Sequence, residues 1–412
     1  MRSSYKRIGD YIQLVDVRNS DLGVKTLLGL TVDKEFIPSV ANTVGANMAN
    51  YKIIRKDQFA CSLMQVRRDK KIPVALLRSY DEAIISQAYP VFEIVDTDEL
   101  LPSYLMMWMS RSEFDREACF YAVGGVRGSL EWEDFCNMEL PVPTPEKQWE
   151  IVNEYRTIVN QIKLNEQLNQ KLEETAQAIY KQWFVDFEFP ISAEYAEAIG
   201  KSELEGKPYK SSGGEMECND ELNQEIPKGW SVGELGDLCN ILDRYRKPLS
   251  GEERQEMQGP YPYYGAVSIV DYVNDYLFDG IHLLLSEDGV KVVDENGYPT
   301  LQYVWGKFWV NNHAHILKGD KLLSTEFLFL SLKKTNFSHL VTGAAQPKIS
   351  QKNMASVQMI VPDNYTFQKF NKKISGIFRY IRCNTDMNHL LTPFREMILL
   401  RMVRHKELHE IH

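Results

Sequence analysis

Two stretches of the chain repeat apolar residues at alternating steps of four and three, the spacing of a coiled-coil seam. The seam of the first stretch consists of Ile151, Tyr155, Ile158, Ile162, Asn165, Asn169, Leu172, Ala176, Ile179 and Trp183. The same spacing returns 219 residues later at Phe370, Ile374, Ile377, Ile381, Asn384, Asn388, Leu391, Arg395, Ile398 and Met402. The pattern predicts long helices over residues 146–185 and 366–412.

Prolines indicate where these helices begin and end. Pro143 and Pro145 precede the first seam and Pro362 precedes the second, and the first turn of a helix tolerates proline. Pro393 lies inside the second seam, and we expect it to kink or end that helix. Arg395 on the seam is consistent with a helix that leaves its partner there.

The asparagines in the two seams indicate which helix is the partner of each. An ordinary pair of core helices would explain the apolar positions, but asparagines at equivalent seam positions favour a partner held in one register. The obvious partner is the other seam. The expected pairing residues are Ile162, Asn165, Asn169 and Leu172 on one helix and Ile381, Asn384, Asn388 and Leu391 on the other. About forty helical residues span roughly 60 Å, so an antiparallel pair would form a rod with a globular domain at each end.

The segments outside the helices also repeat. Matching landmarks are Gly9-Asp10 with Gly236-Asp237, AVGGVRGSL (122–130) with VTGAAQPKI (341–349), and ELPVP (139–143) with QMIVP (358–362). The first pair is 227 residues apart and the others are 219 apart, as the helix seams are. Together with the helix seams these are four matches in one order, which indicate a duplication with a shared frame and a different interior in each copy.

Each copy has a globular part that mixes strand and helix patterns. We predict an α+β fold with globular domains at 1–145 and 228–365, related by an internal pseudo-twofold repeat. TLLGLTVDKEFI, NYKIIRKDQFACSLM, YPVFEIVD, IHLLLSEDG and KFWVNNHAHILKG are read as strands, and LPSYLMMWMSRSEFDREAC and STEFLFLSLKK as helices. Residues 186–227 are polar and acidic and are interpreted as a linker.

Composition narrows the class of protein. The 412 residues contain no apolar run long enough for a transmembrane helix, and the first residues lack the apolar core of a signal peptide. None of the six cysteines has C-x-x-C spacing, which favours reduced thiols in a cytoplasmic protein. The formal net charge is −10, yet residues 1–80 hold fourteen Lys and Arg against seven Asp and Glu. Residues 226–350 hold twelve against fifteen, which argues against a simple electrostatic DNA binder.

No catalytic constellation is found. Gly200-Lys201-Ser202 imitates the end of a phosphate-binding loop, but Tyr195 stands where the first glycine belongs. Methyltransferase, metalloprotease and nucleophile-elbow motifs are absent from the sequence. His313 and His315 share one face of a strand, but with no carboxylate or cysteine nearby in sequence a structural or base-contacting role is favoured over a metal site.

Several polar segments suit contacts with DNA, each with a plainer alternative. The basic side chains between Arg67 and Lys71 would bind phosphates. Alternatively, this run forms a solvated hairpin tip. The glycine-containing loops at 124–129 and 342–348 and the pair Asn311-Asn312 offer hydrogen-bond donors to base edges. Alternatively, these segments only connect secondary-structure elements. A tyrosine of GPYPYYGA offers an apolar contact, or packs within a turn. The candidate contacts are Arg67, Arg68, Lys70, Lys71, Arg127, Ser129, Tyr263, Asn311, Asn312, Gln346 and Lys348.

These segments give the chain a specific resemblance. The motifs that carry it are IGDYIQLVDVRN, GGVRGSLEWEDF, LPVP and AQAIYKQWFVDFEFP in the first half, and GWSVGELGDLCNI, YPYYGA, YLFDG, FWVNNHAHIL, TGAAQPKIS and IVP in the second. In this order, and over nearly the whole chain, they resemble the specificity subunits of type I restriction–modification enzymes.

The resemblance implies a non-catalytic reader of double-stranded DNA. Residues 1–145 and 228–365 would be target recognition domains, each reading one half of an asymmetric bipartite site. Paired helices would hold them apart and bind two methyltransferase subunits, which translocase–nuclease subunits then join. No cofactor is expected on this chain; S-adenosylmethionine, ATP and Mg would be bound by the partners. The named base contacts are inferred from their chemistry, because the bases are read in this family by variable loops.

Other functions remain open from sequence. The chain could be a DNA-binding scaffold that is not coupled to restriction, which co-purification with a methyltransferase would separate. A coiled-coil adhesin or tail component is disfavoured by the missing secretion signal and the reduced cysteines. A hidden catalytic function is disfavoured by the motif search.

Overall fold

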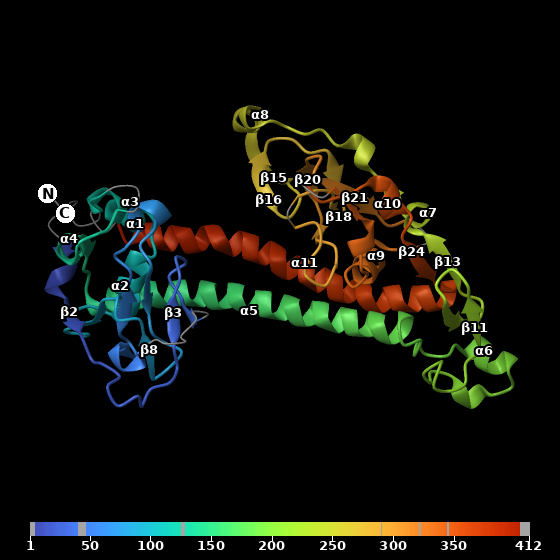
Figure 1. Ribbon diagram of the computed structural model, residues 1–412, viewed down its shortest axis with the longest axis horizontal. Coiled ribbons are helices and arrows are strands. Elements are labelled where there is room, and N and C mark those ends of the chain that lie inside the picture. Colours follow the sequence, from blue (N-terminus) through green and yellow to red (C-terminus); the bar gives the residue numbers. More distant parts are fainter. Residues whose placement is uncertain are drawn as a thin grey trace, which may run out of the picture. The chain divides into compact units, whose positions relative to one another are not determined.

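The computed structural model of the chain describes residues 5–39, 47–124, 128–289, 291–320, 323–343 and 346–403. The chain divides into two compact units: Met1–Leu164 with Met387–His412 (unit 1), and Asn165–Asp386 (unit 2). Two long helices, α5 (Pro145–Phe184) and α11 (Asn364–Arg401), contribute one part to each unit (Figure 1). No helix in the described ranges is long and apolar enough to cross a membrane.

Unit 1 packs short antiparallel strands against helices. Its strands are β1 (Tyr5–Arg7), β2 (Ile12–Val15), β3 (Leu28–Leu30), β4 (Phe36–Pro38), β5 (Lys52–Arg55), β6 (Phe59–Cys61), β7 (Val74–Leu76), β8 (Glu82–Ile85), β9 (Val91–Ile94) and β10 (Glu139–Pro141). Its shorter helices are η1 (Ile8–Asp10), η2 (Met48–Asn50), α1 (Val66–Asp69), α2 (Pro102–Met109), α3 (Ser112–Tyr121) and α4 (Trp132–Asn137). The main sheet has the order β2-β9-β6-β7. Phe59 and Phe92 stack across β6 and β9 with ring centroids 5.0 Å apart, and Phe135 of α4 closes this core.

One predicted helix of unit 1 is two. The segment 101–119 breaks between α2 and α3, where Arg111 is extended at φ −76° and ψ 144°. The hydroxyl of Ser110 donates to the carbonyl of Met106, and the Arg111 guanidinium lies 4.2 Å from the Trp108 ring centroid. Both contacts lie within the segment, whereas Lys34, from outside it, donates to the carbonyl of Met109 before the break and pairs with Asp115 after it.

Unit 2 holds two four-stranded sheets, ordered β14-β21-β18-β19 and β16-β15-β20-β17. Its strands are β11 (Met216–Asn219), β12 (Gln224–Pro227), β13 (Ser231–Glu234), β14 (Asn240–Ile241), β15 (Gln258–Tyr264), β16 (Ile269–Val273), β17 (Phe278–Asp279), β18 (His282–Ser286), β19 (Leu301–Val304), β20 (Lys307–Val310), β21 (Ala314–Lys318), β22 (Val341–Thr342), β23 (Lys348–Ile349) and β24 (Gln358–Val361). Its shorter helices are α6 (Ala193–Ala198), η3 (Ser202–Leu204), α7 (Leu235–Leu238), η4 (Asp243–Tyr245), α8 (Gly251–Glu256), α9 (Thr325–Leu332), η5 (Ser338–Leu340) and α10 (Gln351–Ala355). Phe184 of α5, Phe327 of α9 and Phe370 of α11 meet edge to face in its core.

The acidic segment 186–227, interpreted from sequence as a linker, is folded. It forms α6, η3 and the β11–β12 hairpin. Phe189 stacks between Tyr209 and Trp230, with ring centroids 4.5 Å and 4.9 Å away. Its few aromatic residues therefore anchor an otherwise polar segment to the core of unit 2.

The two units share one frame. In unit 1, β1 pairs with β10 so that Arg7 lies opposite Glu139; in unit 2, β13 pairs with β24 so that Glu234 lies opposite Gln358. These pairs match at the sequence offsets of 227 and 219. A Cβ on Gly9 would lie 2.7 Å from Cys136 Cβ, and one on Gly236 would lie 2.9 Å from Ala355 Cβ, which occupies the equivalent position. The repeat read from the sequence is therefore a repeat of structure.

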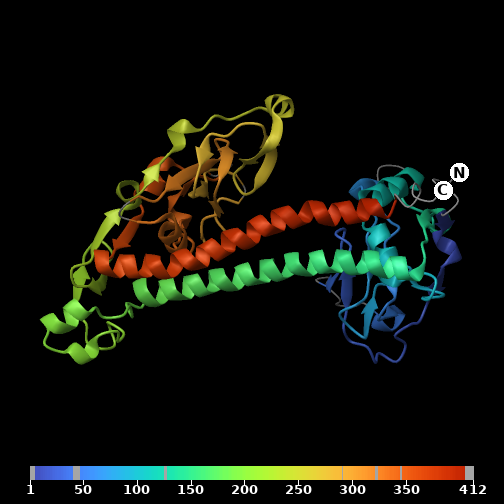
Figure 2. The same ribbon diagram turned by 180° about the vertical axis from the view of Figure 1, so that it is seen from behind.

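Helices α5 and α11 pair antiparallel and lie side by side in both views (Figures 1 and 2). In unit 2, the side-chain amide of Asn384 donates to Asn169 Oδ1 over 2.9 Å, and Asn169 donates to the carbonyl of Ile381. In unit 1, Asn388 donates to the carbonyl of Ile162. The last two contacts are equivalent in the repeat, because Asn169 corresponds to Asn388 and Ile162 to Ile381 at the offset of 219 residues.

The expectation that α11 ends at Pro393 or leaves its partner near Arg395 is wrong. The helix continues through Pro393 to Arg401. Ile398 and Met402 remain buried in the core of unit 1, and Arg401 forms an ion pair with Glu154 of α5. Packing beyond the proline compensates for the backbone hydrogen bond that proline removes.

Candidate nucleic-acid interface

In unit 2, three chain segments that are distant in sequence are bound together by their backbones. The amide of Glu287, after β18, donates to the carbonyl of His313 over 2.9 Å. The amide of Ile349 donates to the carbonyl of Glu287 over 2.8 Å, and that of Gly289 to Pro347 over 3.2 Å. The turn Asn311–His313 and the segment 346–348 therefore share one edge of the unit.

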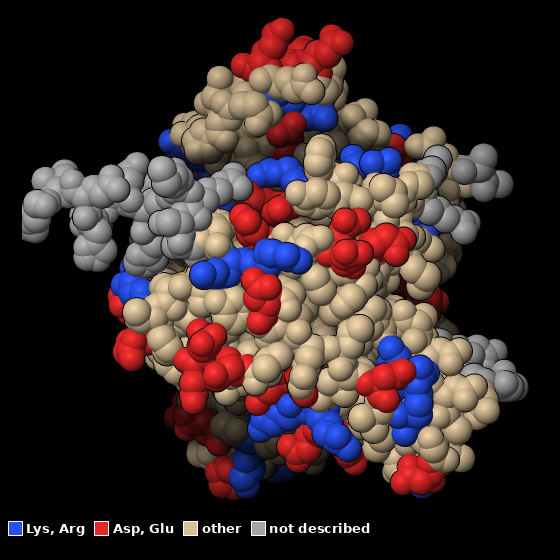
Figure 3. All heavy atoms as spheres, turned by 90° about the vertical axis from the view of Figure 1, so that its left-hand side faces the viewer, with Lys and Arg blue, Asp and Glu red and all other residues tan. Residues whose placement is uncertain are grey.

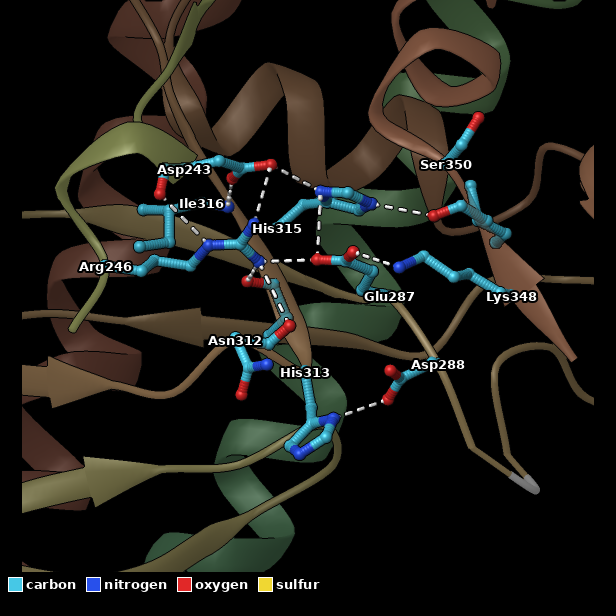
Figure 4. A network of polar contacts seen from close by, with 12 residues as sticks. Asp243, Arg246, Glu287, Asp288, Asn312, His313, His315, Ile316, Lys348 and Ser350 are labelled. Atoms are coloured by element: carbon cyan, nitrogen blue, oxygen red, sulfur yellow. Dashed lines mark hydrogen bonds and ion pairs between the residues drawn. The ribbon is translucent and has the colours of Figure 1, made fainter. Parts of the chain in front are cut away.

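A buried ionic network lies beneath this edge (Figure 4). The guanidinium of Arg246 pairs with Glu287 Oε2 over 2.5 Å and donates to the carbonyls of Asn312 and Ala314. His315 places Nδ1 2.6 Å from Asp243 Oδ2 and Nε2 2.9 Å from the carbonyl of Ile349. Both ring nitrogens therefore face hydrogen-bond acceptors.

Glu287 is the centre of this network. Burial acts to raise the pKa of its carboxyl, but hydrogen bonds from Lys348 and Arg246 and the charge of His315 outweigh burial. The pKa of Glu287 is therefore lower than its ordinary value. The carboxylate remains ionised beneath the surface and fixes the two cations around it.

The same cluster brings together the donor types of a metal site. Ligand atoms of Asp243, Glu287 and His315 lie within 4.8 Å of one another. However, Arg246 and Lys348 already neutralise Glu287, and a metal ion would have to displace them. The donor set fits an internal ion network rather than a metal centre.

The network leaves several predicted contact residues accessible. Asn312 and Gln346 are exposed, and the side chain of Lys348 keeps 49% of its surface although it pairs with Glu287. Asn311 differs, because its side-chain oxygen accepts from the amide of His313 and so shapes the turn. Tyr263 is only 1% exposed, and its hydroxyl accepts from the amide of Leu249. Its ring packs in the core, so we leave it out of the candidate interface.

In unit 1, the basic run begins in the short helix α1 and ends just after it. Arg68 pairs with Asp69 and Lys71 pairs with Asp33. Arg67 and Lys70 have no acidic partner within 4 Å among the described residues. The four basic side chains are therefore not equally free to bind a phosphate.

Buried groups anchor both ends of this run. The amide of Ile72 donates to Asp115 Oδ1 over 3.1 Å, and the thiol of Cys119 donates to the carbonyl of Val66. Lys34 pairs with Asp115 over 2.8 Å, and burial lowers the pKa of this lysine although Asp115 opposes that shift. The basic run is thus held on a fixed base rather than on a free hairpin tip.

The glycine-containing loop of unit 1 adjoins the basic run. Arg67 Nη1 lies 3.5 Å from the carbonyl of Gly124, and a Cβ on Gly128 would lie 2.7 Å from Arg67 Cβ. Ser129 is exposed and pairs with Val123 through two backbone hydrogen bonds. Arg127 lies outside the described residues.

The candidate residues of the two units occupy equivalent places. The amide of Leu130 donates to the carbonyl of Leu63 over 2.9 Å, as the amide of Ile349 donates to Glu287 in unit 2. Leu130 and Ile349 are repeat partners 219 residues apart. The structure therefore brings the basic run together with Ser129 in one unit, and Asn312 with Lys348 in the other.

Surface charge does not single out this interface by itself. On the face shown in Figure 3, Lys and Arg side chains are interspersed with Asp and Glu among uncharged atoms. Among the described residues on that face, the Lys and Arg side chains do not gather into one broad patch.

Sequence reasoning missed Asp243, Arg246 and Glu287. Asp243 and Arg246 stand three residues apart in DRYRKP, and Glu287 follows the apolar run IHLLLS. An acidic residue directly after a fully buried strand is a signal that could have drawn attention to Glu287. No spacing in the sequence links it to Arg246, 41 residues earlier.

Comparisons with known proteins agree with this architecture. The sequence model of the family described as "Type I restriction modification DNA specificity domain" matches residues 227–391. A Haemophilus influenzae protein named as a type I restriction enzyme specificity subunit is 33% identical over 128 residues, which cover 31% of this chain and 32% of that relative. The match thus spans about a third of that relative's length.

Longer matches are more distant. The HindI specificity subunit of Haemophilus influenzae is 23% identical over 78% of this chain and 81% of its own length. The MjaIX specificity subunit of Methanocaldococcus jannaschii is 22% identical, over 75% of this chain and 70% of its own. The crystal structure of a type I restriction–modification S subunit from M. genitalium has the same fold, with a TM-score of 0.54 at 14% identity over 97% of this chain.

The fold is that of a two-unit α+β protein with long paired helices, and its second unit carries the DNA specificity domain. Residues 227–391 match the type I DNA specificity domain, and over most of its length the chain is similar to specificity subunits of type I restriction–modification systems. These relatives are named as specificity subunits, in agreement with the expectation of a non-catalytic chain.

Proposed function

We propose that the chain reads an asymmetric, bipartite DNA site, with one half read by each unit. The observation that carries this proposal is the pair of equivalent surfaces with different chemistry. Unit 1 offers Arg67, Lys70 and Ser129, whereas unit 2 offers Asn312, Gln346 and Lys348. Identical readers would face a palindrome, so a fused pair of unlike readers suits two different half-sites.

The chemistry of each surface divides into two tasks. Lysine and arginine bind phosphates and fix orientation on the duplex. An asparagine or glutamine amide donates to and accepts from the edge of an adenine, and an arginine fork suits guanine. We assign base reading in unit 2 to Asn312 and Gln346, and phosphate binding to Lys348.

We further propose that the paired helices bind two methyltransferase subunits, which translocase–nuclease subunits then join. Support comes from α11 in unit 1, where Met387, Leu390, Phe394 and Met397 are exposed although they are apolar. A groove of about 680 Å³ lies between residues 394–401 of α11 and residues 150–158 of α5. S-adenosylmethionine, ATP and Mg would be bound by the partners, and action on chromosomal and phage DNA would take place in the cytoplasm.

The test is to map methylated adenines in the genome of a cell that carries this chain with its methyltransferase. We expect methylation at one interrupted sequence made of two different half-sites. Deletion of this chain should abolish that methylation while leaving the methyltransferase present. Methylation that persists without this chain, or that follows no common sequence, would reject the proposed function.

A further inference from the structure

The ionic network of unit 2 is more than a local ion pair. It contains the carboxylates of Asp243 and Glu287 and the basic groups of Arg246, His315 and Lys348. Asp243, Glu287 and His315 are all buried. Burying charges is costly even when they are paired, and replacing buried ion pairs by apolar residues often stabilises a protein. A contribution to overall stability is therefore a weak explanation for the network.

Arg246 and Glu287 hold the segments at the candidate interface. Arg246 binds the turn through the carbonyls of Asn312 and Ala314. Glu287 binds Arg246 through one carboxylate oxygen and Lys348 through the other. Figure 4 shows these side chains converging from separate strands and loops.

We propose that Arg246 and Glu287 are positioning residues that hold the Asn311–His313 turn and the segment Gln346–Lys348 as one base-reading surface. The inference rests on the proposed function and deepens it, because neither residue is itself assigned to touch a base. Arg246 is suited to this role because one guanidinium nitrogen, Nη1, lies within hydrogen-bond distance of Glu287 Oε2 and of the carbonyls of Asn312 and Ala314. Without the Arg246 guanidinium, the Asn311–His313 turn would lose its fixed orientation.

Two substitutions with opposite effects on charge separate positioning from electrostatics. Glu287→Gln removes a negative charge and releases Lys348, so binding to non-cognate DNA should stay equal or become tighter. Arg246→Gln removes a positive charge, so binding to non-cognate DNA should stay equal or weaken. If both residues position the reading surface, both variants should discriminate less well against a wrong base pair, by about tenfold, within the range of one mismatched pair.

The experiment uses the full chain in complex with its methyltransferase subunits. Affinity is measured for three duplexes: one with the mapped site, one with a base pair changed in the first half-site, and one with a base pair changed in the second. Discrimination should fall in one half-site only, the half read by unit 2. The other half-site provides an internal standard for the amount of folded protein.

A matched control is available in the same unit. Glu326 accepts from the hydroxyl of Tyr303 and pairs with Arg382. Its side chain and that of Arg382 are 15% and 22% exposed, close to the 11% and 15% of Glu287 and Arg246. The pair lies on α9 and α11, and among the described residues no hydrogen bond or ion pair joins it to the three interface segments. Glu326→Gln should lower the melting temperature without changing discrimination.

The outcomes are distinct. Loss of discrimination in Glu287→Gln and Arg246→Gln, but not in Glu326→Gln, supports the positioning role. Unchanged discrimination in either network variant overturns it, as does an equal loss in the Glu326→Gln control. If the wild-type complex itself does not discriminate between the duplexes, the proposed function fails instead.

Discussion

At the scale of single residues, side-chain partners decide which charges can serve a ligand. Four basic residues stand together in the sequence of unit 1, but Arg68 and Lys71 already pair with Asp69 and Asp33. Exposed ion pairs are weak, at about 0–1 kcal/mol, yet each adds a carboxylate that repels a phosphate. Arg67 and Lys70 are therefore the better candidates for phosphate contacts.

We predict that Arg67→Ala and Lys70→Ala weaken DNA binding by the assembled complex more than Arg68→Ala and Lys71→Ala do. For each lost phosphate contact, the slope of log affinity against log salt should become shallower by about 0.9. The loss should be similar for cognate and non-cognate duplexes, because phosphates carry no sequence information. Equal slopes for the wild type and all four variants would mean that the basic run is a solvated surface that does not contact DNA.

Glu287 should also make the stability of unit 2 sensitive to acid. Its pKa is below the ordinary value of 4.5 in the folded chain, so its stabilising effect is present above the unfolded pKa and is lost as pH falls through the folded pKa. We predict that the melting temperatures of the wild type and Glu287→Gln differ most near neutral pH. The difference should shrink as the pH is lowered below 4.5, and a constant difference across that range would contradict the assignment.

At the scale of elements, the paired helices combine an apolar seam with polar layers. The amide of Asn384 meets Asn169 across the pair, and Asn388 and Asn169 each reach a backbone carbonyl of the opposite helix. Apolar seam residues tolerate sliding by a heptad, because each knob finds a similar hole. The asparagines hydrogen-bond satisfactorily in one register, so they select it at some cost in stability.

We predict that replacing Asn165, Asn169, Asn384 and Asn388 together by leucine keeps or raises the free energy of unfolding but loosens the register. Spin labels at the exposed positions 171 and 380, both in unit 2, should give a narrow distance distribution in the parent chain. The leucine variant should give a broader or bimodal distribution. An equally narrow distribution in a fully folded variant would show that the apolar seam alone sets the register.

At the scale of the whole molecule, one frame carries two different interiors. The strand pairs β1–β10 and β13–β24 and the Gly9 and Gly236 turns repeat in both units. Between these landmarks the units differ, since the network of Asp243, Arg246 and Glu287 lies wholly in the second interior. If each unit reads its own half-site, the part of a unit between the repeated landmarks can be exchanged while the landmarks themselves are kept.

We predict that exchanging residues 240–340 for the matching segment of a related subunit changes one half of the methylated sequence. The other half and the spacing should stay the same, because base contacts are local to each unit. Lys348 lies outside this segment but pairs with Glu287 inside it, so an exchange of 240–348 should give the more active hybrid. Methylation mapping of both hybrids tests this, and an active hybrid with both halves altered, or neither, would refute modular reading.

The long helices, the repeat and the absence of known catalytic motifs were determined by the sequence alone. Helical periodicity and matched landmarks are local properties that survive without knowledge of the fold. Unit 1 also shows the limit of this reasoning, because the extended backbone at Arg111 divides a segment whose pattern is continuously helical.

Only the tertiary structure decided which polar residues act together and which are hidden. The sheet order β14-β21-β18-β19 places segments far apart in sequence side by side, and so brings His315 to Asp243, 72 residues away. The same folding buries Tyr263, which the sequence offered as a contact, and anchors the acidic segment 186–227 through its aromatic residues. Periodicity is a local property of the sequence. The neighbours of a side chain depend instead on which strands pair, and strand pairing is decided only when the whole core packs.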